Sequence, residues 1–152
     1  MSSESRASTS TGGFTADEKA AMKARAAELR AEAKREKGAS KAAAELADVV
    51  AAIAAMSDGD RVIAERVHEL VLAAEPTLAA RTWYGMPAYA LDGKVVCFFK
   101  SAGKFDGRYC ELGFNEPAKL DDGTMWPTVF AIIAVGPAEA ARITELVTRA
   151  AG

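Results

Sequence analysis

The stretch that decides the fold is WYGMPAYALDGKVVCFFK, residues 83–100. Its centre is the Asp-Gly pair at 92–93, which readily takes the positive backbone angles of a type I′ hairpin turn and separates two apolar runs. The second run, residues 95–99, has no polar alternation, so we expect a central strand that is covered on both faces. Gly85 and Pro87 predict an irregular entry into the sheet, because glycine admits unusual dihedrals and proline restrains the residue before it.

Further strands are expected on both sides of this hairpin. The pattern predicts four strands in all, at residues 87–91, 94–100, 108–114 and 128–135, joined by loops that carry glycine. Short connections of this kind favour an antiparallel meander. Ten of the eleven aromatic residues fall within residues 83–130, which predicts one aromatic-rich core in the sheet region.

The sequence before the sheet favours helices. Residues 15–18 have the S/T-x-x-E form of a capping box, and the Ala, Glu and Lys-rich stretch that contains them predicts a helical arm over residues 14–37 with a weak apolar stripe. After Gly38 we expect two amphipathic helices, the second ending before Pro76. A last helix is expected to begin near Pro137, because proline is favoured in a first helical turn.

Together these elements predict an α+β fold. An antiparallel four-stranded sheet packs with two preceding helices and a C-terminal helix, and the N-terminal helical arm is additional. The predicted organisation is a Ser, Thr and Gly-rich disordered tail at residues 1–13, the arm at residues 14–37, and a single α+β domain at residues 40–152.

Charge and cysteine usage predict the setting of the protein. The 19 basic and 21 acidic residues give a net charge of −2, which predicts no attraction of nucleic acid or of an anionic membrane. No apolar run is long enough to span a bilayer or resembles a secretory signal. Cys97 and Cys110 lie in predicted strands, which favours buried, reduced thiols over a disulfide. We therefore expect a cytoplasmic location.

Catalytic motifs are absent from the sequence. His68 is the only histidine, and its place beside the apolar face of a predicted helix favours a solvated or boundary side chain over a catalytic one. The chain has no C-x-x-C, G-x-S-x-G, Walker or G-x-G-x-x-G motif. These absences disfavour an enzyme, and they predict no cofactor.

The aromatic and methionine side chains around Gly85 are the best candidates for a binding site. Rings and thioethers form concave apolar pockets whose polar atoms orient a ligand, and a nearby Lys or Arg can hold a carboxylate or phosphate. The alternative for each ring is that it fills the core of a small sheet. The candidate ligand-binding residues are Trp83, Tyr84, Met86, Tyr89, Lys94, Arg108, Tyr109 and Trp126, the last of them in a loop that would close over the pocket.

Four motifs together resemble the YdhG-like domain family, a bacterial group of unknown function. They are WYGMPAY, DGKVVCFF, RYCELGF and LDDGTMWP, and the resemblance covers residues 60–150, while the arm resembles an extension carried by some relatives. The resemblance implies an α+β fold with an antiparallel sheet and offers no catalytic residues. One branch is described as frataxin-like and linked to intracellular iron delivery, so the resemblance also implies an iron-chaperone role.

The sequence is therefore compatible with three functions. The first is a non-enzymatic domain that binds a small molecule or a protein partner through the aromatic pocket. The second is an iron chaperone, since weak iron binding favours carboxylate oxygen, and its candidate ligands are Glu65, Glu69, Asp121 and Asp122. These acids equally suit a solvated helix face and a turn. The third is an interaction module in which the arm forms a homodimer with a second copy.

Overall fold

The computed structural model describes residues 15–152. The tail expected at residues 1–13 and the first residue of the expected arm, Phe14, lie outside the described residues. The chain separates into two compact units, the first ending at Ser40 and the second running from Lys41 to Gly152. Each unit is described below by itself.

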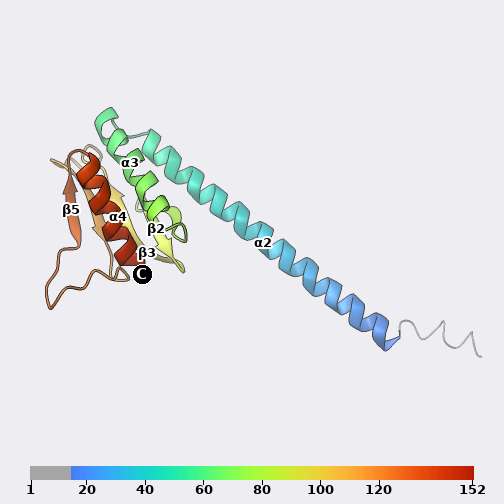
Figure 1. Ribbon diagram of the computed structural model, residues 1–152. Coiled ribbons are helices and arrows are strands. Elements are labelled where there is room, and N and C mark those ends of the chain that lie inside the picture. Colours follow the sequence, from blue (N-terminus) through green and yellow to red (C-terminus); the bar gives the residue numbers. More distant parts are fainter. Residues whose placement is uncertain (1–14) are drawn as a thin grey trace, which may run out of the picture. The chain divides into compact units, whose positions relative to one another are not determined.

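Helix α2 spans Ala16–Ala54 (Figure 1), and its residues up to Ser40 make up nearly all of the described part of the first unit. The predicted capping box is confirmed: the Glu18 amide donates to Thr15 Oγ1 at 3.2 Å, and the Thr15 amide donates to Glu18 Oε2 at 3.3 Å. The predicted helix boundary at Gly38 is wrong, because α2 continues through it. One glycine costs a helix about 1 kcal/mol, and the alanines, lysines and glutamates around it are strong helix formers that offset this cost.

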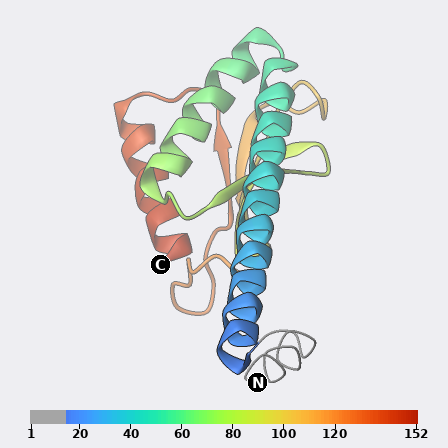
Figure 2. The same cartoon turned by 90° about the vertical axis from the view of Figure 1, so that its right-hand side faces the viewer.

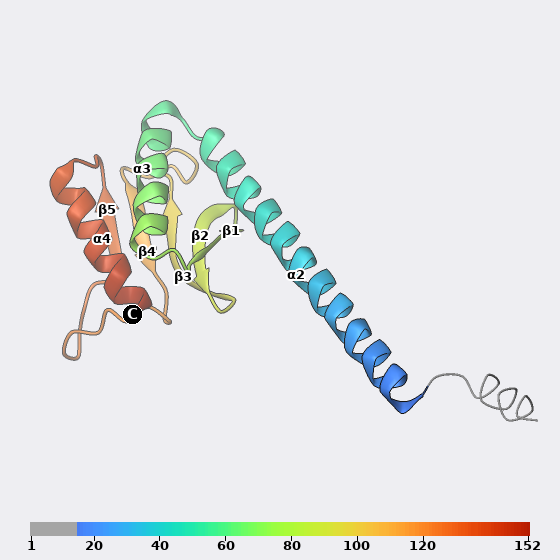
Figure 3. The ribbon, with the colours of Figure 1, turned by 45° about the vertical axis from the view of Figure 1, so that its right-hand side comes forward.

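The second unit contains a five-stranded antiparallel sheet in the order β1-β2-β3-β4-β5 (Figure 3). The predicted meander is confirmed, but four strands were expected, and β1 is the strand that the sequence pattern missed. Its sequence, AARTW, has two alanines and little apolar alternation, so it lacks the usual signal of an edge strand. The strands are β1 Ala79–Trp83, β2 Met86–Leu91, β3 Lys94–Lys100, β4 Cys110–Phe114 and β5 Val129–Ile132.

Two helices cover one face of this sheet. Helix α3 spans Asp58–Ala74 and α4 spans Pro137–Ala151, and both lie on the same side of the strands (Figures 1 and 2). The core between helices and sheet includes Tyr89, Phe99 and Leu112, all at most 1 % exposed. The C-terminal turns of α2 contribute Val49 and Ile53 to the same core.

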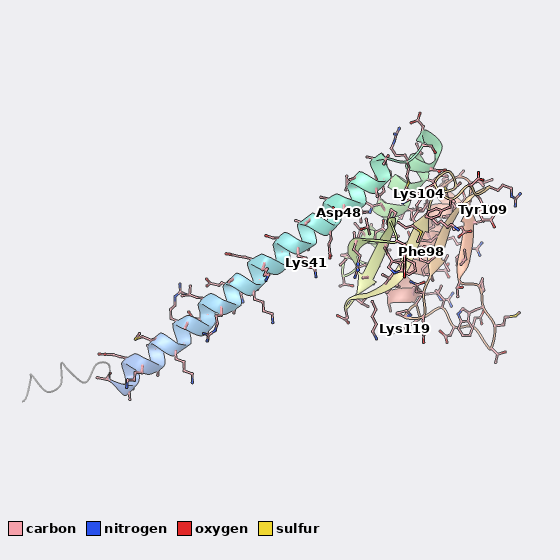
Figure 4. All side chains as sticks on the ribbon, turned by 180° about the vertical axis from the view of Figure 1, so that it is seen from behind. Lys41, Asp48, Phe98, Lys104, Tyr109 and Lys119 are labelled. Atoms are coloured by element: carbon pink, nitrogen blue, oxygen red, sulfur yellow. The ribbon has the colours of Figure 1, made fainter. Side chains whose placement is uncertain are left out.

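The other face of the sheet is covered by its own side chains. Side chains alternate along a strand, so Phe98 of β3 lies opposite Phe99, on the face away from the core (Figure 4). The Trp83 ring packs against the Phe98 ring, with their centroids 5.2 Å apart. Gly113 faces Phe98 across β3 and β4 and leaves the space that the ring occupies. The expected covering of β3 on both faces is thus provided by helices on one side and by rings on the other.

Within residues 15–152, no helix combines the length and the apolar content that crossing a bilayer requires.

Candidate functional site

The Trp83 segment forms a tight hairpin turn. Trp83 and Met86 are paired across β1 and β2, and the two residues between them have positive φ angles, 51° at Tyr84 and 76° at Gly85. Positive φ at both central positions is the mark of a type I′ turn, in which glycine is favoured at the second position. The irregular entry into the sheet that Gly85 and Pro87 predicted is therefore a regular two-residue hairpin connection.

A cavity of about 510 Å³ lies beside this turn. Its walls come from the end of α2, the start of α3, the first residues of β2, and the loop that follows β3. Most of its lining is apolar, and the side chains that bring polar atoms to it are those of Ser57, Asp60, Ser101 and Lys104. Volumes of 300–1,000 Å³ with a few convergent polar groups are typical of small-ligand sites. Its apolar side chains include Met56, Met86, Pro87, Phe99 and Phe105.

Asp60 fixes one wall of this cavity. Its Oδ2 accepts a hydrogen bond from the Gly103 amide at 2.8 Å, and its Oδ1 accepts one from the Cys110 thiol at 3.4 Å. These two bonds tie the first turn of α3 to the loop after β3 and to the start of β4. Because each carboxylate oxygen of Asp60 already accepts a hydrogen bond, we interpret this side chain as one that holds the loop in place.

Lys104 brings a positive charge to the cavity. Its Nζ donates to the Gly85 carbonyl at 3.2 Å, so the lysine bridges the loop and the hairpin turn. The same ammonium lies 5.6 Å from the centroid of the Phe105 ring. The Nζ atom of Lys100 also lies near this ring, 5.2 Å from its centroid. Lys104 has no ion-pair partner among the described residues. A ligand anion can therefore bind the Lys104 ammonium without breaking a salt bridge.

The structure brings only one of the predicted site residues to the cavity, and this residue is Met86. The Trp83 ring packs on Tyr84 and Phe98, with centroid distances of 4.9 Å and 5.2 Å, and the Tyr84 side chain is 81 % exposed. Tyr89 is fully buried in the core. The ring residues of the motif are therefore divided between surface packing and the core.

The remaining predicted residues lie elsewhere. Lys94 is exposed at the start of β3, and the Arg108 guanidinium stacks over the Tyr109 ring at 5.4 Å. Trp126 packs against the core in the loop before β5, whereas Trp83 ends β1, and these two strands are the opposite edges of the sheet. This arrangement does not place the Trp126 loop over the Trp83 turn.

His68 and Tyr89 form a polar contact at the edge of the core. The Tyr89 hydroxyl lies 2.8 Å from His68 Nδ1, and the two rings are tilted, with centroids 5.7 Å apart. Burial lowers the pKa of His68, and the charge of Glu69 partly opposes this shift. Burial, together with the nearby Cys97, raises the pKa of Tyr89. In the tautomer that carries its proton on Nε2, the neutral histidine accepts a hydrogen bond from the protonated Tyr89 hydroxyl.

The two cysteines are free and buried, as predicted. Burial raises the pKa of Cys97 to about 12. It also raises the pKa of Cys110 to about 11, where the Asp60 carboxylate adds to the shift and a hydrogen bond from the Ala102 backbone opposes it. Since the thiolate is the reactive form, neither side chain is a ready nucleophile at neutral pH.

The carboxylates proposed for iron do not converge. Both glutamates lie on the exposed surface of α3 and pair with arginines of the same helix. Glu65 Oε1 lies 3.9 Å from Arg61 Nε, and Glu69 Oε2 lies 3.0 Å from Arg66 Nη1. Asp121 and Asp122 are exposed in the loop between β4 and β5. Across residues 15–152, no group of three or more His, Cys, Asp or Glu side chains is placed to hold a metal ion.

Sequence reasoning missed the polar residues of the cavity, which are Ser57, Asp60, Ser101 and Lys104. A usable signal was present in the SAGKFDG loop at residues 101–107, where two glycines flank a lysine and an aromatic ring. Comparisons of the chain with models of known protein families, with curated proteins and with solved structures found no match.

Proposed function

We propose that residues 41–152 form a non-enzymatic binding domain for a small anionic molecule with an apolar body. The ligand occupies the cavity beside the Tyr84-Gly85 turn. The observation that carries this proposal is Lys104, an ammonium without an ion-pair partner in the described chain, held over a cavity that is mainly apolar. Its attraction for a carboxylate, sulfonate or phosphate is stronger there than in water, because the apolar walls lower the local dielectric constant.

The chemistry of the surrounding groups supports binding over catalysis. Both thiols have raised pKa values, and the only histidine is engaged with Tyr89. The proposal also includes a cytoplasmic location and membership of the YdhG-like family, both of which rest on the sequence. Neither the iron-chaperone role nor self-association of the arm has a contact in the described residues that favours it.

A fluorescence titration with 1-anilinonaphthalene-8-sulfonate, an anionic probe with an apolar body, tests the proposal. The folded full-length chain is expected to bind the probe at one saturable site. Lys104→Ala should weaken binding by more than about tenfold, because an interaction with a charged group contributes about 1.5–3 kcal/mol and about 1.4 kcal/mol is a factor of ten. Met86→Ala, which opens the apolar wall, should weaken it as well.

Lys94→Ala is the matched control, because it removes the same charge from an exposed position away from the cavity. Binding by this variant should equal that of the unchanged chain. Equal losses in Lys94→Ala and Lys104→Ala would show that the probe responds only to net charge, and would overturn the proposal. Since the probe also binds loosened proteins, each variant must retain a cooperative urea transition.

A further inference from the structure

Helix α2 carries an asymmetric charge distribution in the first unit. From Lys19 to Lys37 it has seven basic and three acidic residues, a net charge of +4, although the whole chain has −2. At 3.6 residues per turn, five of the seven cations fall within one arc of about 60° on the helix surface. We call this set the basic stripe: Lys19, Lys23, Arg30, Lys34 and Lys37.

The acidic residues of this segment lie on another face. By the same geometry Glu28, Glu32 and Glu36 are all about 100° or more from the basic stripe. Arg25, which is outside the stripe, lies 3.2 Å from Glu28 and 3.9 Å from Glu32. Two of the three acids are therefore paired with a cation that lies outside the basic stripe.

The basic stripe has no such neutralisation. All five of its side chains are exposed, and none forms an ion pair with another residue of the described chain. Five unpaired cations over 18 residue steps extend for about 27 Å along a straight helix. A linear array of this length matches an extended polyanion better than a single small anion.

Two other occupants fit less well. A membrane surface requires a broad apolar face beside the cations, but Met22 and Leu29 are the only large apolar residues among those described in the first unit. A second copy of α2 would have to pack against the narrow apolar strip that contains Met22 and Leu29. The other apolar residues of this strip are alanines, so a helix pair formed through it would bury little apolar surface.

Although the net charge of the whole chain predicts no attraction of nucleic acid, we propose that the basic stripe, whose local charge is positive, binds the phosphates of double-stranded DNA. The major groove is about 12 Å wide and admits one α-helix, whereas the deep, narrow major groove of duplex RNA does not. A helix with cations on one face and acids elsewhere docks by the cationic face and keeps the acidic face toward solvent. Because the stripe has no aromatic residue and makes only charge contacts, binding is independent of base sequence.

Fluorescence anisotropy of a labelled 20-base-pair duplex, titrated with the full-length chain over a series of salt concentrations, tests this inference. Five phosphate contacts predict a slope of log affinity against log salt of about −4 to −5. The double variant Lys23→Gln/Lys34→Gln should reduce that slope by about 2, since each lost phosphate contact removes about one unit.

The double variant Arg25→Gln/Arg35→Gln is the matched control. It removes the same net charge from the same segment, but both positions lie outside the basic stripe. Glutamine is a good helix former, so circular dichroism should show equal helix content in both variants. The control is expected to keep nearly the full salt slope.

Three results would overturn the inference. The first is an equal loss of slope in both double variants, which would mean that net charge alone attracts the duplex. The second is binding to vesicles of phosphatidylserine without binding to the duplex. The third is a change in sedimentation mass with the stripe variants in the absence of DNA, which would identify a second copy as the partner. Loss of the cavity site would leave the salt slope unaffected, so the two proposals fail separately.

Discussion

Tyr89 places a hydroxyl group in the interior of the second unit, where an unpaired polar group would cost about 1–3 kcal/mol. His68 supplies the partner, at 2.8 Å. A neutral imidazole can accept a hydrogen bond at Nδ1, whereas a doubly protonated one can only donate. Protonation of His68 therefore deprives the buried hydroxyl of its acceptor.

This contact predicts a pH dependence of stability. Unfolded His68 takes up a proton near pH 6.5, and the folded protein holds the pKa of the same side chain lower. Below pH 6.5 the unfolded state thus binds more protons, and the free energy of unfolding falls as the pH falls toward the folded pKa. Urea unfolding between pH 7.5 and 5.5 should show this loss, and His68→Gln should reduce it. An unchanged pH profile in His68→Gln would contradict the assignment.

Gly113 provides a second prediction for a single residue. A Cβ at this position would overlap the Phe98 ring, so Gly113→Ala must displace the ring. Overpacking of this kind costs about 1–3 kcal/mol, which urea unfolding would measure as a lower midpoint. Gly59→Ala is the control, because a Cβ there meets no atom within 4 Å. A destabilisation by Gly59→Ala as large as that by Gly113→Ala would argue against ring displacement as the cause.

The elements were largely predictable where local chemistry decides them. The Asp92-Gly93 turn, with φ angles of 52° and 80°, follows directly from its residue types. The start of α4 at Pro137 and the capping box of α2 are local signals of the same kind. Strand β1 was missed because its pairing with β2, rather than its own apolar pattern, makes it a strand.

The continuity of α2 through Gly38 yields a prediction for an element. A Cβ at Gly38 meets no atom within 4 Å, so Gly38→Ala should add helical stability of about 1 kcal/mol. Hydrogen exchange should show slower exchange of the amides on both sides of residue 38. Gly38→Pro should produce the opposite result, because proline removes a backbone donor and clashes with the preceding turn. Unchanged exchange in both variants would mean that residue 38 is not helical in solution.

The candidate cavity is a property of the whole second unit. Its lining residues Met56, Asp60, Met86 and Lys104 come from four segments that only the tertiary fold brings together. The sequence pointed to the Gly85 turn because turn chemistry is local, and Met86 does line the cavity. It predicted Lys94 or Arg108 as the anchoring cation, whereas the fold brings Lys104 to the Gly85 carbonyl instead.

The placement of the core predicts which part of the chain folds alone. Among residues 15–152, every buried residue of the core lies at Val49 or beyond. Deleting residues 1–40 should therefore leave the free energy of unfolding of residues 41–152 within about 0.5 kcal/mol of its value in the full chain, the range for changes that remove no packed group. Trp83 and Trp126 both lie in this unit, so their fluorescence in urea reports its unfolding.

A longer deletion, of residues 1–54, provides the contrast. It also removes Val49 and Ile53, which are 0 % and 5 % exposed and belong to the same core as Tyr89. Because losing one large buried aliphatic side chain costs about 2–5 kcal/mol, this chain should unfold at a much lower urea concentration or fail to fold. If the shorter deletion were as harmful as the longer one, residues 15–40 would contribute to the core. If neither deletion had an effect, the packing of α2 at Val49 would not stabilise the sheet and its helices.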